Sequence, residues 1–341
     1  MPAVELPSTS TLLDHLSEFR GRRGYLIDAA HGSGKQIGNH GDALMFDVFR
    51  QIAHEAGISW VADPTDAEIL VVRPNGALLE IYTFPDLLAQ ELRRLPDIPL
   101  VIFPSSAFFP TQDPSRIFEG RSAPVVWVFR ERYSFKHIRE SWAPQLEALN
   151  VRLVLDHDVV AGGNRYVSSL IGSPVREKHV LIAARIDAEA PTGKPMVKSS
   201  KSAAGPSRLK RAVARMLTKT EPGPVRRLGF RVYNRKRSTT ASAALLEKLP
   251  VAERSAVEAA RGKTIALDAS AKHLVSYGEY KRLVRDASIV VTDRLHVALP
   301  AAIIGKQVIL VEAGYHKLSG VYQQSLTALP NITLINAVDD E

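Results

Sequence analysis

The stretch "SIVVTDRLHVALPAAIIGKQVILVEAG", residues 288–314, contains the pattern from which the fold is inferred. It begins with a short apolar run, continues through the polar residues "TDRLH" into an apolar helical stretch, and closes on a second run, "KQVILVEAG". Short runs rich in Val, Ile and Leu that alternate with helices are typical of a parallel sheet covered on both faces. The stretch therefore predicts a strand–helix–strand unit.

The same alternation extends upstream through most of the chain. "KHVLIAARIDAEA" (178–190) and "KTIALDA" (263–269) are expected strands, and "GYLIDAA" (24–30) opens a further series of strands and helices. The 341 residues suit two domains. We expect an α/β protein with two Rossmann-like domains, residues 1–175 and 176–341, that face each other across a cleft. Ligands of such sheets bind beyond the carboxyl ends of the strands.

The stretch "DALMFDVFRQIAHEAG" (42–57) shows the helical period most clearly. Leu44, Val48 and Ile52 recur at every fourth position and form an apolar face. Asp42 is expected to cap the start of this helix and Gly57 its end.

Composition indicates a soluble, cytoplasmic protein. The chain has no cysteine, which excludes disulfides and thiolate metal sites. Its N-terminus does not resemble a signal peptide, and its apolar runs are shorter than the ~20 residues of a membrane span.

The positive charge of the chain is concentrated in one segment, at about 194–237. This segment has 14 Lys or Arg residues and one acid, Glu221, whereas the whole chain has a net charge of +8. A solvated insertion is the commonest explanation for such a block. The alternatives are an anionic membrane surface or a phosphorylated substrate. Nucleic acid is the least favoured partner, because stacking aromatics and DNA-binding motifs are missing.

The glycine-rich stretch "HGSGKQIGNHGD" (31–42) invites comparison with a P-loop. Gln36 follows Gly34-Lys35 where Ser or Thr should hold magnesium, and Ala29 occupies the position of the first glycine. The P-loop is therefore rejected. A metal site is not expected either, because the ligand spacing that zinc sites use is absent.

Two loops carry the stronger functional signals. In "GNHGD", Gly38, Asn39, Gly41 and Asp42 precede a helix whose free N–H groups suit an anion. An ordinary strand-to-helix turn explains this loop equally well. In "DRLH", Arg294 and His296 place a cation and a titratable group at the end of a strand. A structural Asp293–Arg294 pair with a capping histidine is the alternative there.

Three weaker loops also follow expected strands. They are "FPSS" with Ser105 and Ser106, "AARIDAEA" with Arg185 and Asp187, and "EAGYHKLSGVYQQS" with Tyr315, His316, Lys317 and Ser319. Their common position at strand ends is more informative than any one of them.

Together these segments resemble the polysaccharide pyruvyltransferase family. "IGNHGDALM" resembles that family's helix-start motif, "PSSAFF" its Pro-Gln-Ser segment, "VFRERYS" its arginine run and "ARIDAE" its R-x-D-x-E. "VVTDRLHVALPAAIIGKQVILVEAGYHKLSGVY" (290–322) is similar to its D-R-L-H block. The resemblance covers about residues 24–325, apart from the basic segment. Pro300 departs from the family and predicts a kink or a later start in the helix that follows.

The resemblance implies a GT-B-like fold and transfer of a carboxyethylidene group from phosphoenolpyruvate to two hydroxyls of one sugar. His296 would be the acid/base, Arg294 would hold the anionic donor, and Asp42 would orient or deprotonate the acceptor. The implied substrate-binding residues are Gly38, Asn39, Gly41, Ser106, Arg130, Arg185, Leu295, Lys317 and Ser319. No metal or cofactor is implied beyond the donor itself.

The acceptor that the resemblance implies is a saccharide, in some relatives linked to a polyprenyl diphosphate. The basic segment is then expected to contact the anionic inner membrane face. Two alternatives remain open. One is a nucleotide-sugar glycosyltransferase, in which Glu312 would be the carboxylate that binds the ribose. The other is a glycan-binding protein without activity.

Overall fold

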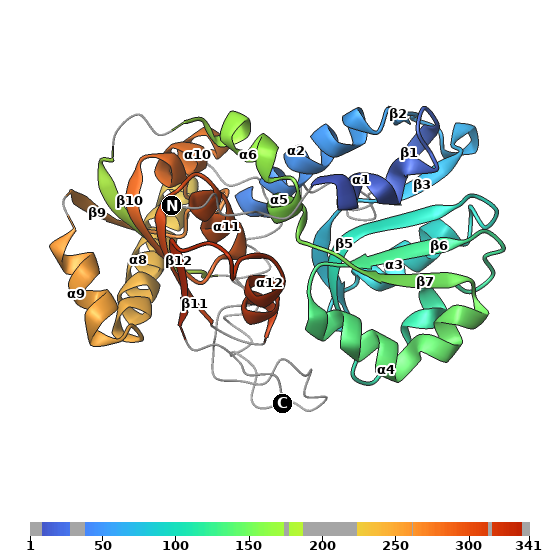
Figure 1. The fold of residues 1–341 in the computed structure, drawn as a ribbon. Coiled ribbons are helices and arrows are strands. Elements are labelled where there is room, and N and C mark those ends of the chain that lie inside the picture. Colours follow the sequence, from blue (N-terminus) through green and yellow to red (C-terminus); the bar gives the residue numbers. More distant parts are fainter. Residues whose placement is uncertain are drawn as a thin grey trace.

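A computed structural model describes the protein over residues 9–27, 38–173, 177–186, 224–260, 262–312 and 316–335. In the long helix α8 (Pro224–Glu247), the side chains are described from Asn234 onward. Within these residues two sheets form, and every strand pair in both is parallel. Figure 1 shows the two sheets side by side, each with helices around it. The prediction of an α/β protein with parallel sheets is confirmed.

The N-terminal sheet has seven strands in the order β2-β1-β3-β5-β6-β7, with β4 paired to β5 beyond β3. The C-terminal sheet has five, in the order β12-β11-β10-β8-β9. The strands of the N-terminal sheet are β1 (Arg23–Ile27), β2 (Ser59–Trp60), β3 (Ile69–Val72), β4 (Asn75–Leu79), β5 (Leu100–Phe108), β6 (Val125–Phe129) and β7 (Val151–Leu155). Those of the C-terminal sheet are β8 (His179–Ala183), β9 (Lys263–Ala266), β10 (Ala287–Thr292), β11 (Gln307–Val311) and β12 (Ile332–Ile335).

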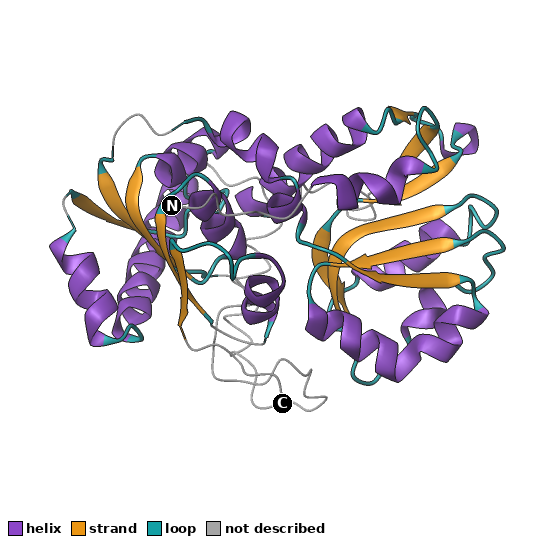
Figure 2. Ribbon diagram, in the orientation of Figure 1, coloured by secondary structure: helices purple, strands orange, loops and turns teal. Residues whose placement is uncertain are grey.

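Helices lie on either side of each sheet (Figure 2), because parallel strands are joined by helical crossovers that pack on the faces of the sheet. Short 3₁₀ turns form at Pro64–Asp66 and Pro114–Ile117. The helices are α1 (Thr9–Ser17), α2 (His40–Glu55), α3 (Phe84–Leu92), α4 (Arg132–Ala148), α5 (Val159–Gly162), α6 (Asn164–Ile171), α8 (Pro224–Glu247), α9 (Val251–Ala259), α10 (Tyr277–Arg285), α11 (Leu295–Ile303) and α12 (Lys317–Ser325). None of the helices in the described ranges is both long and apolar enough to cross a bilayer.

The two sheets follow the same winding rule. In each, the first strand lies inside the sheet, the second adds on one side, and the third adds on the other. The direction in which new strands are added therefore reverses between β1 and β3 in the N-terminal sheet and between β8 and β10 in the C-terminal sheet, although all strands stay parallel. Such switch points open a crevice at the carboxyl ends of the strands.

The core is continuous between the sheets. Val48 of α2, Val159 of α5, Leu181 of β8 and Leu299 of α11 belong to one cluster of fully buried apolar side chains. The predicted apolar face of α2 is part of this cluster. The two sheets are therefore joined by packing as well as by the chain that runs from β7 to β8.

The start of α2 differs from the sequence expectation, whereas its end does not. Asn39, and not Asp42, is the N-cap of α2, and its side-chain oxygen accepts the N–H of Gly41 at 2.7 Å. Asp42 stands three residues later and accepts the N–H of Asn39 at 2.8 Å, which completes a capping box. The prediction for Asp42 as N-cap was wrong because an aspartate at the third helical position serves the reciprocal bond equally well. Gly57 ends the helix as expected, with φ of +72°.

The predicted basic segment, residues 194–237, falls largely outside the described residues. The described part of its C-terminal end is the beginning of α8. Asn234 and Ser238 on this helix are buried, and the Ser238 hydroxyl accepts the backbone N–H of Asp268.

Candidate functional site

A cleft of about 650 Å³ lies between the two sheets at the carboxyl ends of their strands. Its lining includes six Lys or Arg residues and four carboxylates, so it is positively charged overall. The cations are Arg73, Arg130, Arg185, Lys272, Arg294 and Lys317, and the carboxylates are Asp42, Asp268, Asp293 and Glu312. Such a cleft favours an anionic ligand.

The two strongest sequence motifs meet in this cleft. A Cβ placed on Gly41 would lie 2.6 Å from Cβ of His296, so the "GNHGD" helix start packs directly on "DRLH". Gly38, Asn39, Asp42, Arg294, Leu295 and His296 all line the cleft. The adjoining His40 ties α2 to the C-terminal sheet, because its backbone N–H donates to Ser270 O at 2.9 Å. The pairing of these loops is a property of the tertiary structure.

A fully buried carboxylate stands behind His296. Asp158 lies just after β7, and its Oδ2 is 3.1 Å from Nε2 of His296 and 3.0 Å from Nη1 of Arg130. The Val160 N–H also donates to it at 2.9 Å. Burial alone raises the pKa of Asp158, but the charge and hydrogen bond of His296, with Arg130, outweigh burial and hold the pKa below its ordinary value. Asp158 is therefore an anion that fixes Nε2 of His296.

His296 has one ring nitrogen left for a ligand. Its side chain is 11% exposed. Both hydrogen bonds of the ring use Nε2, and within the described part of the chain no residue bonds to Nδ1. Because an ionised carboxylate accepts, Nε2 carries a hydrogen and Nδ1 is the atom that can take up or release a proton.

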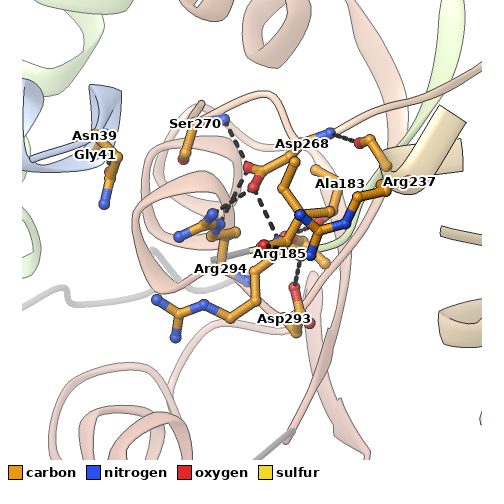
Figure 3. A network of polar contacts seen from close by, with 12 residues as sticks. Asn39, Gly41, Ala183, Arg185, Arg237, Asp268, Ser270, Asp293 and Arg294 are labelled. Carbon is orange, nitrogen blue, oxygen red and sulfur yellow. Dashed lines mark hydrogen bonds and ion pairs between the residues drawn. The ribbon is translucent and has the colours of Figure 1, made fainter. Parts of the chain in front are cut away.

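Arg294 is held by the C-terminal sheet. Its Nε donates to Oδ1 of Asp268 at 3.1 Å and its Nη2 to Oδ2, a two-pronged ion pair buried at the cleft wall. Figure 3 shows Arg294, Asp268, Arg185 and Asp293 gathered together, with Asn39 and Gly41 of α2 opposite them. The structural pair of Arg294 is thus with Asp268, whereas the sequence suggested Asp293.

Asp293 supports the neighbouring arginine instead. Its Oδ1 accepts the backbone N–H of Arg185 at 2.8 Å. Burial raises the pKa of Asp293, and the charges of Arg185 and Arg294 act against that rise. Arg185 follows β8 and Asp293 follows β10, the two strands that flank the switch point.

A second group of cations gathers on the side of the N-terminal sheet. A Cβ on Gly76 would lie 2.7 Å from Nζ of Lys317 and 2.9 Å from Nη2 of Arg130. Ser106 accepts from Nε of Arg130 at 2.8 Å, which fixes the guanidinium. Ser106 thus acts through Arg130 and is not part of the cleft lining. We call Arg130 and Lys317 the Gly76 cation pair.

Ser319 also lies behind the lining. It is fully buried, and both its N–H and its hydroxyl donate to Oε2 of Glu312, at 2.6 and 2.8 Å. Glu312 itself faces the cleft. Ser319, predicted as a substrate-binding residue, therefore lies behind the cleft lining and orients Glu312.

One wall of the cleft is apolar. It comes from the loop after β3 and the segment that enters α3, and is formed by Pro74, Tyr82, Phe84 and Leu87. Leu87 is 36% exposed. The cleft thus combines charged strand ends with a wall that suits the apolar face of a ring.

Sequence reasoning missed Asp158, Asp268 and Gly76. The first two follow strands β7 and β9, so their position at a strand end was a usable signal. Gly76 is the second residue of β4, and a glycine within a strand indicates close approach of another group. Among the described residues no group of three or more His, Asp or Glu side chains could hold a metal ion.

The fold and the cleft define an α/β protein with a candidate ligand site at the carboxyl ends of two parallel sheets. No known protein family matches the chain, and no curated protein matches it. Among solved structures it is similar to a functionally uncharacterised protein of Klebsiella pneumoniae, with 16% sequence identity and a TM-score of 0.53. That similarity covers 96% of this chain and 97% of the other, and it concerns the fold alone.

Proposed function

We propose that this chain is a pyruvyltransferase that moves a carboxyethylidene group from phosphoenolpyruvate to two hydroxyls of one sugar in a cell-surface glycan. The observation that carries the proposal is the packing of Gly41 on His296, with Asp158 behind the ring and cations on both sides of the cleft. We further infer a GT-B-like arrangement of two Rossmann-like domains, divided near residue 175.

The charges of the cleft suit the donor. Phosphoenolpyruvate carries a carboxylate and a phosphate, and it needs cations at two places. The Gly76 cation pair offers one place, and Arg185 with Arg294 offers the other. Arginine forks match either anion. Because Asp158 and Asp268 hold two of these guanidinium groups, the cations are oriented before the ligand arrives.

The first chemical step is a proton transfer to the donor. Nδ1 of His296 gives its proton to the methylene carbon, which becomes a methyl group and leaves positive charge on the adjacent carbon. A sugar hydroxyl attacks that carbon through its oxygen. Asp158 holds Nε2–H throughout, so the ring keeps its orientation.

The second step completes the ketal. A second hydroxyl of the same sugar bonds to the same carbon while the carbon–oxygen bond to phosphate breaks, and the electron pair leaves with phosphate. Of the two hydroxyl protons, one restores His296 and the other leaves on phosphate. Asp42 orients one hydroxyl, although its Oδ2 also serves the capping box. Tyr82 and Phe84 pack against the apolar face of the sugar.

The test is phosphate release from phosphoenolpyruvate in the presence of methyl galactosides and glucosides. Changing His296 to Asn should lower the rate by roughly 10²- to 10⁴-fold. The matched control is His54→Asn, because His54 lies on the exposed last turn of α2, outside the cleft lining. A new methyl signal at the ketal carbon of the sugar product would identify the reaction.

Other outcomes reject the proposal. Equal rates for His296→Asn and His54→Asn would remove His296 from the chemistry. Sugar binding without turnover of any donor would favour a glycan-binding protein.

A nucleotide-sugar glycosyltransferase is the second candidate. It is favoured by Glu312, which faces the cleft and is oriented by Ser319 at the start of α12. A carboxylate there can accept from two ribose hydroxyls. Release of a nucleoside diphosphate from a nucleotide sugar, abolished by Glu312→Gln, would support this candidate.

A further inference from the structure

The backbone carbonyl of His296 has lost its usual helical partner. Pro300 stands four residues later in α11, and proline has no N–H to donate to that carbonyl. The helix is accordingly not regular there, since His296 has φ −85° and ψ 20°. The kink expected from Pro300 thus falls on the candidate catalytic residue.

Another helix supplies the missing donor. The hydroxyl of Tyr280 on α10 donates to the His296 carbonyl. Tyr280 is fully buried, with its ring centroid 5.7 Å from that of His40 and 5.9 Å from that of Tyr277. Burial, helped by the charge of Asp42, raises the pKa of Tyr280, so the hydroxyl stays protonated and remains a donor.

Three contacts from three separate segments therefore hold His296. Gly41 of α2 packs against its Cβ, Asp158 after β7 accepts from its ring, and Tyr280 of α10 donates to its carbonyl. A buried carbonyl without a donor is costly, so loss of the Tyr280 hydroxyl would let the kinked turn rearrange.

We propose that Tyr280 is a positioning residue, which holds the proline-kinked turn of α11 so that His296 faces the cleft with Nε2 on Asp158. The proposal rests on the proposed function insofar as His296 is the proton donor. The proline and the tyrosine form a matched pair, because Pro300 removes the helical donor and Tyr280 replaces it.

The test uses histidine labelled with ¹⁵N and side-chain NMR of the whole protein, with His296 assigned by the His296→Asn variant. In the unchanged protein the neutral form of His296 should show the tautomer with hydrogen on Nε2. Tyr280→Phe, which removes only an oxygen, should shift the His296 signals toward a mixture of both tautomers. The matched control is Tyr277→Phe on the same helix, whose hydroxyl donates to Asp47 at 2.7 Å.

Kinetics give the second measurement. Tyr280→Phe should lower kcat by roughly ten- to a hundred-fold with little change in KM, because a small misplacement of a catalytic group has that effect. Pro300→Ala supplies a competing N–H, so its effect and that of Tyr280→Phe should not add in the double variant. Unfolding curves of each variant establish that the fold is kept.

The outcomes separate this proposal from the proposed function. If Tyr280→Phe leaves the His296 signals unchanged, or Tyr277→Phe shifts them equally, the positioning role is refuted even when phosphoenolpyruvate is turned over. If the signals shift as expected and no donor is turned over, the positioning role stands and only the proposed function fails.

Discussion

Gly41 has room for a hydrogen atom and nothing larger, since its nearest neighbour across the cleft is Cβ of His296. The sequence alone explained this glycine equally well as part of a helix start. The structure adds a second requirement, because any side chain at this position would push His296 away from Asp158. A residue in a motif can thus serve a site through the side chain that it lacks.

Replacing Gly41 with Ala is expected to reduce phosphate release by roughly a hundred-fold, since a displacement of about 1 Å has that effect. The matched control is Gly278→Ala in the first turn of α10, where a Cβ would have no neighbour within 4 Å. Steady-state kinetics and thermal unfolding of both variants check the prediction. Full activity in Gly41→Ala would contradict the packing argument.

Replacing Asp158 with Asn should also abolish most activity, by roughly 10²- to 10⁴-fold, because the amide no longer holds Nε2–H of His296 as an anion does. The control is Asp156→Asn, two residues earlier, where the carboxylate accepts from Thr11 at 3.0 Å and lies 2.6 Å from His15 on α1. That change should lower stability and leave kcat unchanged. Steady-state kinetics and urea unfolding of both variants distinguish the loss of activity expected for Asp158→Asn from the loss of stability expected for Asp156→Asn.

At the scale of elements, the alternation of apolar runs was sufficient to predict most strands and α2. The sequence did not reveal where α4 begins, at Arg132, because this helix has few buried positions and its cap, Glu131, is not a common one. Strand β4 was missed because only Arg73 and Pro74 separate it from β3. These two residues line the cleft, so the interruption of the strand belongs to the site.

An ion pair at the C-terminal end of α10 should make the stability of the fold depend on pH. Asp286 accepts from Nε of Arg285 at 2.7 Å and from Nζ of Lys178 at 2.7 Å. The hydrogen bond from Arg285, with that from Lys178, overcomes the effect of burial and lowers the pKa of Asp286 from 3.8 to about 2. Because the folded-state pKa is the lower one, this carboxylate stabilises the fold above pH 4, and the contribution is lost as pH falls toward 2.

Asp286→Asn should therefore lower the free energy of unfolding at neutral pH. The difference in this free energy between the variant and the unchanged protein should shrink as pH falls from about 4 to about 2. Urea unfolding across this range measures the difference. Asp14→Asn, on the exposed side of α1, serves as the control. It should leave the free energy of unfolding unchanged both at neutral pH and at about pH 2. A difference for Asp286→Asn that persists at pH 2 would assign the effect to something other than ionisation.

At the scale of the whole molecule, the continuous core predicts that the two sheets unfold together. The three tryptophans, Trp60, Trp127 and Trp142, all belong to the part of the chain that forms the N-terminal sheet. Their fluorescence therefore reports on that half, whereas circular dichroism reports on both. We expect the two signals to change at the same urea concentration, and two separate midpoints would show that the halves unfold independently.

The sequence by itself determined the local features: the parallel α/β class, the apolar face of α2, and the two polar loops that follow β1 and β10. These depend on residues close together in the chain, and hydrophobic period and turn chemistry report them directly. Only the tertiary structure decided which distant residues complete the site. Asp158 is 138 residues from His296, and Tyr280 reaches that histidine from another helix. Such pairings follow from which strands and helices become neighbours, and the order of strands in each sheet is not written in any local pattern.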